Sequence, residues 1–131
     1  CSSDLTLAAL GMYEGVASTS INQLDSNDQH GMVKVLLEGA IKRVREADAA
    51  LHLGEFQKKS TQVTKAQKII FGLRRTLNFE AGGEIAAQLD SLYDYCLRTL
   101  TVAHASNDTG KFTEVVGILE ELLSGWNEIK Q

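Results

Sequence analysis

The amino-acid sequence predicts an all-α protein, an antiparallel up-down-up-down four-helix bundle that follows a short N-terminal arm or helix. Three observations predict this fold. The 131 residues include no proline, so long helices can propagate without a breaker. Along four long segments, apolar residues recur at spacings of three and four, as in amphipathic helices with one buried side. The connections between these segments are short, and short connections make neighbouring helices antiparallel.

The first two helices are predicted from their apolar stripes and from the residues at their ends. The first runs from about residue 28 to residue 51, with Asn27 or Asp28 as the N-terminal cap, and Gly54 ends it. The second runs from residue 55 to about residue 78. The Gly82-Gly83 pair then breaks the chain, because glycine tolerates the left-handed conformation that closes helices.

The third and fourth helices are predicted on either side of a polar turn. The third covers residues 84 to about 106, with Cys96 in its apolar stripe. Residues 106–110, with the sequence SNDTG, have the composition of a turn. The fourth covers residues 111 to about 130, with its apolar residues on one side and glutamates on the other. Residues 28–131 are therefore expected to form one bundle domain.

The first 27 residues differ from the rest, because short apolar pieces alternate there with Ser, Thr, Asn and Asp. This pattern predicts an N-terminal arm. The chain begins with Cys1, not Met, which is compatible with a trimmed chain, the favoured interpretation, and also with a mature lipoprotein whose first cysteine carries lipid. We expect a protein of the reducing cytoplasm, because Cys1 and Cys96 have no partner at metal-ligand or redox spacing.

Charge is distributed unevenly along the chain, and this distribution by itself excludes few classes of function. Residues 31–75 carry a net charge of +6 and the remainder −10, which gives a total of −4. No aromatic residues are interleaved with Lys42, Arg43, Arg45, Lys58, Lys59, Lys65, Lys68, Arg74 and Arg75, so solvated helix faces are favoured over a nucleic-acid site. Apolar runs are far shorter than the ~20 residues that cross a bilayer, so no membrane insertion is expected.

Residues that commonly carry catalysis do not form a convincing site. His30, His52 and His104 lie far apart near predicted helix ends, so neither a metal site, a cofactor nor an enzyme activity is expected. The carboxylate pairs Glu120-Glu121 and Asp90/Asp94 are expected on solvent faces with ordinary pKa values. One alternative function is a histidine phosphotransfer relay built on His30 and Lys34, although their spacing and the first-turn position of His30 fit that motif poorly.

Several short motifs stand in a recognisable order. They are Gly39-Ala40-Ile41, Lys65-Ala66-Gln67-Lys68-Ile69-Ile70, Leu77 with Gly82-Gly83-Glu84-Ile85-Ala86, Leu92-Tyr93-Asp94-Tyr95, and Trp126. Together, over about residues 32–129, they resemble the flagellar secretion chaperone family FliS. Residues 12–16, from Met12-Tyr13 to Val16, resemble less closely the tyrosine-bearing arm of that family. The chain departs from the family at the entry to the first long helix, where Asn27-Asp28-Gln29-His30 stands without a proline.

This resemblance implies a cytoplasmic chaperone that is not an enzyme. Its implied cargo is the C-terminal segment of flagellin, which wraps around the bundle and is kept from polymerising too early. A second implied role is delivery of that cargo to the export gate of the flagellar secretion apparatus. The sequence does not settle the oligomeric state, and a monomer is the working expectation.

The apolar stripes of the first two helices are wider than one core requires, so we expect some apolar surface to be left for a partner. Leu36 with Leu37, Ala40 with Ile41, and Ile69 with Ile70 are adjacent apolar pairs. A helix that is wrapped on all sides would explain any one pair equally well. The residues predicted to bind the partner are Leu37, Ile41, Ile69, Leu73 and Tyr93, together with Tyr13 and Val16 of the arm, which we expect to cover the groove until cargo displaces them.

Overall fold

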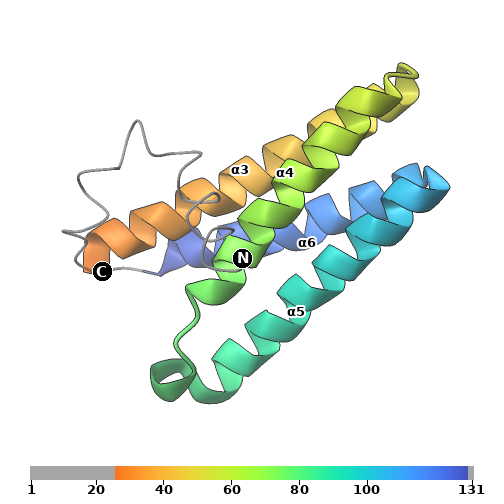
Figure 1. Cartoon of the computed structure of the whole chain (residues 1–131). Helices are drawn as coiled ribbons and strands as arrows, with labels where there is room; N and C mark the ends of the chain where they lie inside the picture. Colours follow the sequence, from red (N-terminus) through yellow and green to blue (C-terminus); the bar gives the residue numbers. More distant parts are fainter. Residues whose placement is uncertain (1–25, 130–131) are drawn as a thin grey trace.

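The computed structural model of the chain describes residues 26–129 and shows four helices within them. Figure 1 shows the helices running alternately up and down, which confirms the predicted all-α bundle. Tyr13 and Val16 of the predicted arm lie outside the described residues. The helices are α3 (Ser26–His52), α4 (Phe56–Arg75), α5 (Phe79–Ser106) and α6 (Thr109–Glu128).

The four helices form a ring in which each one packs against two neighbours. Helix α3 contacts α4 and α6, and α5 contacts the same two helices from the other side. The most extensive contact is between α3 and α4, and the least extensive is between α5 and α6. This ring places one end of every helix at each end of the bundle (Figure 1).

Most of the predicted helix ends are confirmed to within a few residues. Gly54 follows α3 with a φ of +73°, where a left-handed backbone favours glycine. Asn107 adopts the left-handed conformation after α5, and Asp108 accepts a 3.2 Å hydrogen bond from the Lys111 amide at the start of α6. Helix α3 begins at Ser26, two residues earlier than predicted, so both predicted N-terminal caps, Asn27 and Asp28, lie inside the helix.

The connection between α4 and α5 differs from the prediction. Helix α4 ends at Arg75, three residues early, and Asn78 instead caps the next helix by accepting a 3.0 Å hydrogen bond from the Ala81 amide. One helical turn follows before Gly83, whose φ of +52° kinks the chain. The predicted break at Gly82-Gly83 is therefore real, but it lies within α5. The extra turn forms because Asn78 satisfies a free amide at its start.

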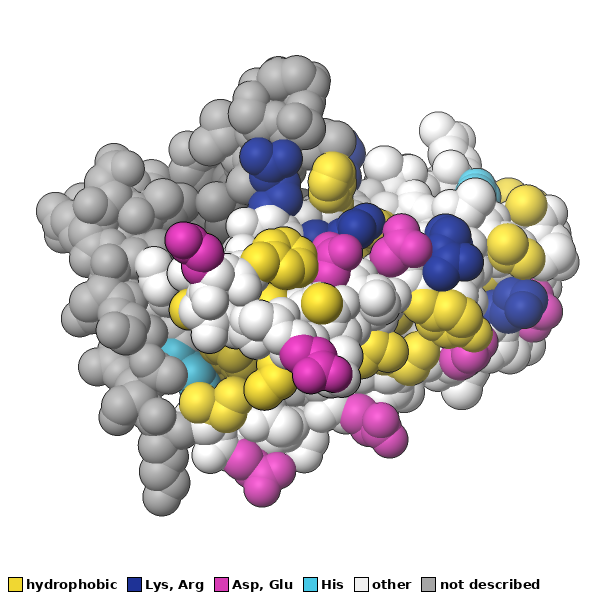
Figure 2. Space-filling model, turned by 90° about the horizontal axis from the view of Figure 1, so that it is seen from below, with side chains coloured by type: hydrophobic (Ala, Val, Ile, Leu, Met, Phe, Trp, Pro, Cys, Tyr) yellow, Lys and Arg dark blue, Asp and Glu magenta, His cyan; other side chains and the backbone are white. Residues whose placement is uncertain are grey.

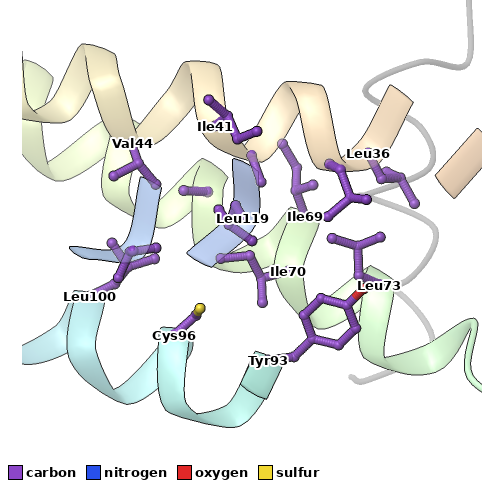
Figure 3. Packing of buried hydrophobic residues seen from close by; sticks show 14 of the residues in the cluster. Leu36, Ile41, Val44, Ile69, Ile70, Leu73, Tyr93, Cys96, Leu100 and Leu119 are labelled. Carbon is purple, nitrogen blue, oxygen red and sulfur yellow. The ribbon is translucent and has the colours of Figure 1, made fainter. Parts of the chain in front are cut away.

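The core is a single cluster along the axis of the bundle, contributed by all four helices. Figure 3 shows Leu36, Ile69, Leu73, Tyr93, Leu100 and Leu119 converging on it from different helices. Both members of the adjacent pairs Leu36/Leu37, Ala40/Ile41 and Ile69/Ile70 are buried. The wide apolar stripes of α3 and α4 are therefore buried inside the bundle, where these two helices share the most extensive contact.

Candidate functional site

An open pocket lies at the end of the bundle where α3 and α5 begin and where α4 and α6 end. Its volume is about 750 Å³. Large cavities with a mostly apolar lining are common binding sites in proteins, so this "end pocket" is the first candidate site. Side chains that line it include Val33 and Leu37 of α3, Leu89 and Tyr93 of α5, and Leu122 and Trp126 of α6.

His30 and Trp126 join the two helix ends at the rim of this pocket. Their rings stack at a centroid distance of 4.7 Å. The Trp126 indole Nε1 donates a 2.8 Å hydrogen bond to the His30 carbonyl, and His30 Nε2 donates one of 2.9 Å to the Trp126 carbonyl. This reciprocal latch ties the start of α3 to the end of α6. The His30 ring is thus engaged in packing and hydrogen bonding, unlike a phospho-accepting histidine that faces solvent.

The five residues predicted on the bundle to bind a partner lie in or against the core. Ile69 and Leu73 are fully buried, whereas Leu37 and Tyr93 are buried side chains that also line the end pocket. Burial raises the pKa of the Tyr93 phenol to about 12, so this side chain stays neutral. Ile41 lines a different hollow between α3 and α6. Partner binding by these residues remains a prediction.

A row of exposed apolar side chains on α5 was missed by the sequence analysis. Figure 2 shows hydrophobic side chains on the side of the molecule where α5 lies, with acidic side chains beside them. Spacings of three and seven residues place the row on one side of the helix, and this regularity was the signal available in the sequence. The "α5 row" consists of Ile85, Leu92, Tyr95 and Val102, whose exposed fractions are 68%, 38%, 37% and 49%.

Ion pairs join α5 to α4 on a side of α5 that differs from the side of the α5 row. Arg74 makes two hydrogen bonds to Asp90, of 2.8 and 3.1 Å, and a weaker contact of 3.4 Å to Asp94. The hydrogen bonds from Arg74 lower the pKa of Asp90. The expectation that Asp90 has an ordinary pKa on a solvent face was wrong, because the sequence does not reveal the arginine opposite.

The far end of the bundle is closed by a buried lysine. Lys59 is only 4% exposed and donates a 3.0 Å hydrogen bond to the His104 carbonyl and another to Asn107 Oδ1. These acceptors lie at the C-terminal end of α5, where the helix dipole favours a cation. Desolvation by burial and, to a smaller extent, the charge of Lys59 lower the pKa of His104. Lys59 is therefore not on the solvated helix face that the sequence predicted.

Neither a metal site nor a membrane span is found among the residues that the structure describes. No three His, Cys, Asp or Glu side chains between residues 26 and 129 come close enough to hold a metal ion. None of the four helices combines the length and hydropathy that crossing a bilayer requires.

Comparison with known proteins connects this chain to a family. Residues 12–131 match the family described as "Flagellar protein FliS". FliSB of Pseudomonas aeruginosa, named a flagellar secretion chaperone, is 35% identical over 123 residues, which cover 94% of this chain and 96% of that protein. FliS of Vibrio cholerae is 36% identical over 92% of this chain and 88% of its own length, and FliS of Bacillus subtilis is 30% identical over 95% and 90%.

This chain belongs to the FliS family of flagellar secretion chaperones. The resemblance predicted from the sequence motifs is thereby confirmed, and the relatives' names support an export-chaperone role. In this FliS-family chain, the two helices that flank α5 carry net charges of opposite sign. Helix α4 carries six basic and no acidic residues, whereas α6 carries four acidic residues and one basic residue. Tyr95 of the α5 row donates a hydrogen bond to Glu114 of α6, so the row adjoins the acidic helix.

Proposed function

We propose that this chain binds the C-terminal region of flagellin before secretion, prevents its premature polymerisation and assists its delivery to the flagellar export gate. The observation that carries the proposal is the apolar surface that the bundle leaves outside its core, namely the α5 row and the end pocket. The family supports it, because its curated members are named flagellar secretion chaperones.

The apolar surface suits a cargo made of amphipathic helices. Such helices associate through their apolar sides, and a groove or row of apolar side chains on another protein can cover those sides instead. Full burial of an exposed leucine or isoleucine contributes roughly 1.5–3 kcal/mol. The row and the pocket together can therefore hold a cargo firmly without any covalent chemistry, as expected of a chaperone and not of an enzyme.

We further propose that the arm of residues 1–27 covers part of this surface in the free protein, with Tyr13 and Val16 as its contact residues. Gln29 and His30 line the end pocket just after the arm, so the arm joins the bundle beside that pocket. Cargo would displace it, and the apparent affinity would be reduced by the fraction of molecules in the open state. The packing of the His30 ring against Trp126 favours this chaperone role over a phosphotransfer relay.

The cytoplasm is the proposed site of action, because cargo must be held before it is exported. No cofactor or metal is required for such holding. A monomer suffices in this proposal, because a single bundle carries both the row and the pocket.

Calorimetric titration with the C-terminal fragment of flagellin from the same organism tests the proposal. We expect binding with a negative heat-capacity change, because apolar surface is buried. Leu92→Glu on the α5 row is expected to weaken binding at least about tenfold, since a buried charge replaces an apolar contact. Val35→Glu on α3 is the matched control, because Val35 is similarly exposed, at 41%, but lies outside the row and the pocket lining.

Equal affinity for the two variants would contradict the assigned surface, and no binding to the wild-type chain would contradict the proposed cargo. Removal of residues 1–17 tests the arm. We expect tighter binding of the fragment, and an unchanged affinity with an intact bundle would rule out the arm as a lid.

A further inference from the structure

A line of carboxylates runs along α6 beside the α5 row. Glu114, Glu121 and Glu128 recur at intervals of seven residues, which places them on one side of the helix, roughly 10 Å apart. The Tyr95 hydroxyl donates a 2.6 Å hydrogen bond to Glu114 Oε2, so this "acidic row" begins beside the α5 row. All three glutamates are exposed, and no lysine, arginine or histidine of residues 26–129 forms an ion pair with them.

Two glycines leave free space on the same side of α6. Gly117 lies in the interior of the helix, where glycine is about 1 kcal/mol less favourable than alanine, and Gly125 lies in its last turn. A Cβ atom at either position would meet nothing within 4 Å, so packing among the described residues does not require glycine there. The absence of side chains would, however, allow the backbone of another helix to approach α6 closely.

We propose that the cargo segment on this side of the chaperone is an amphipathic helix whose Lys or Arg residues recur every seven positions along one flank. This inference rests on the proposed function and names the chemistry of the cargo. The apolar side of the cargo helix would lie on the α5 row, and its basic flank would pair with Glu114, Glu121 and Glu128. Charge complementarity favours a basic partner, because this side of α6 is acidic and no basic residue between positions 26 and 129 forms an ion pair with the acidic row.

A second copy of this chain is a less suitable occupant. In a symmetric dimer each α6 would bring the same acidic row towards its partner, and like charges repel. The spacing of the row also matches a helix, because basic residues seven positions apart on a helix are separated by the same distance.

Neutralising the acidic row tests the inference. The triple variant Glu114→Gln/Glu121→Gln/Glu128→Gln is expected to bind the C-terminal flagellin fragment about tenfold more weakly at low salt, because three exposed ion pairs are lost. Its affinity should also depend less on salt than that of the wild type. The control Glu38→Gln/Glu46→Gln/Glu55→Gln makes the same change in net charge on α3 and the following loop, and it should keep wild-type affinity.

Gly125 offers an independent steric test. Gly125→Gln should leave the bundle as stable as the wild type or more stable, since the position is helical and open, yet it should weaken fragment binding by about tenfold or more. Gly125→Ala, which adds only one carbon, should have a smaller effect on binding.

The outcomes separate the inference from the proposed function. If the wild type binds the fragment but the triple variant keeps both its affinity and its salt dependence, the basic cargo helix is overturned and the chaperone role stands. If the wild type does not bind the fragment, the proposed function fails as well. If sedimentation shows a wild-type dimer that the triple variant dissociates, the surface belongs to a second copy, which also overturns the inference.

Discussion

The two ends of the bundle differ in how the space between the helix ends is filled. At one end, Lys59 reaches across to the last carbonyl groups of α5, and His52 Nε2 lies 3.1 Å from Thr109 Oγ1, so polar contacts close the space between the helix ends. At the other end, the latch between His30 and Trp126 joins only α3 and α6, and the end pocket stays open between the helices.

This difference between the two ends indicates that the closed end contributes mainly to stability and the open end mainly to binding. At the closed end the buried Lys59 ammonium is hydrogen-bonded within the bundle, whereas His104 Nδ1 is buried without a partner among the described residues. The large exposed apolar side chains near this end are Leu53, Phe56 and Val102, the last residue of the α5 row. The open end and the adjoining α5 row leave apolar groups exposed that residues 26–129 do not cover. Substitutions at the closed end should therefore change the free energy of unfolding, whereas substitutions at the open end should change cargo affinity.

The largest expected effect on stability is that of Phe112→Ala near the closed end. Phe112 is fully buried in the first turn of α6, so its loss should lower the free energy of unfolding by about 3–5 kcal/mol. The folded molecules should keep their cargo affinity. The contrasting variant is Leu89→Ala at the end pocket, where Leu89 is only half-buried and binding should suffer more than stability. Urea unfolding and calorimetry measure the two quantities, and the reverse pattern would remove the distinction between the ends.

A second prediction concerns the buried lysine. Lys59→Ala should destabilise the bundle by about 2 kcal/mol, because the His104 carbonyl and Asn107 lose a charged hydrogen-bond donor. Lys58→Ala is the control, since the neighbouring Lys58 is exposed, and it should change the free energy of unfolding by no more than about 0.5 kcal/mol. Equal effects of the two variants in thermal unfolding would show that Lys59 does not close this end.

The latch at the open end should contribute less. His30→Ala is expected to lower the free energy of unfolding by about 1 kcal/mol, since a hydrogen bond and a stacking contact are lost. Trp126 is the only tryptophan, so its fluorescence reports directly on this contact. The emission spectrum should change in His30→Ala and remain unchanged in His52→Ala, because His52 lies at the opposite end. An unaltered spectrum in His30→Ala would argue against the latch.

The smallest predicted effect is the pH dependence that arises from Asp90. Arg74 lowers the pKa of Asp90 in the folded state, so the pair stabilises the fold above the unfolded pKa of about 3.9. That stability is lost as the pH falls through the lower, folded pKa. Because the pair is partly exposed, its contribution is at most about 1 kcal/mol. Asp90→Asn should therefore unfold with a slightly flatter acid dependence, and an identical dependence would show that the pair contributes nothing.

Local signals were sufficient to predict the architecture from the sequence. Apolar spacing predicted four helices, and Gly54 and the turn at residues 106–110 marked helix ends because caps and left-handed residues act over a few positions. Gly83 marked a kink within α5. The turn that starts at Asn78 was missed because its cap lies inside the stretch assigned to the preceding helix.

The functional surface was harder to predict because it depends on which side of each helix faces the core. Helix α5 has two apolar rows, and only the one with Tyr93 and Cys96 is buried. In α4, by contrast, the adjacent residues Ile69 and Ile70 are both buried. Periodicity identifies apolar rows, but the extent of contact with the neighbouring helices decides which rows are covered, and α4 shares the most extensive contact with α3 whereas α5 shares the least extensive one with α6. Likewise, the partners of Lys59 and Arg74 are set by contacts between helices and not by local sequence.

Hydroxyl-radical footprinting with and without the C-terminal flagellin fragment shows directly whether cargo covers the open end and the α5 row. We expect cargo to protect Leu92, Tyr95 and Trp126 from oxidation. Leu53 and Phe56, which are exposed at the closed end, should remain as reactive as in the free chain. Protection of Leu53 and Phe56 with an unprotected α5 row would show that cargo binds at the closed end and not on the open end and the α5 row.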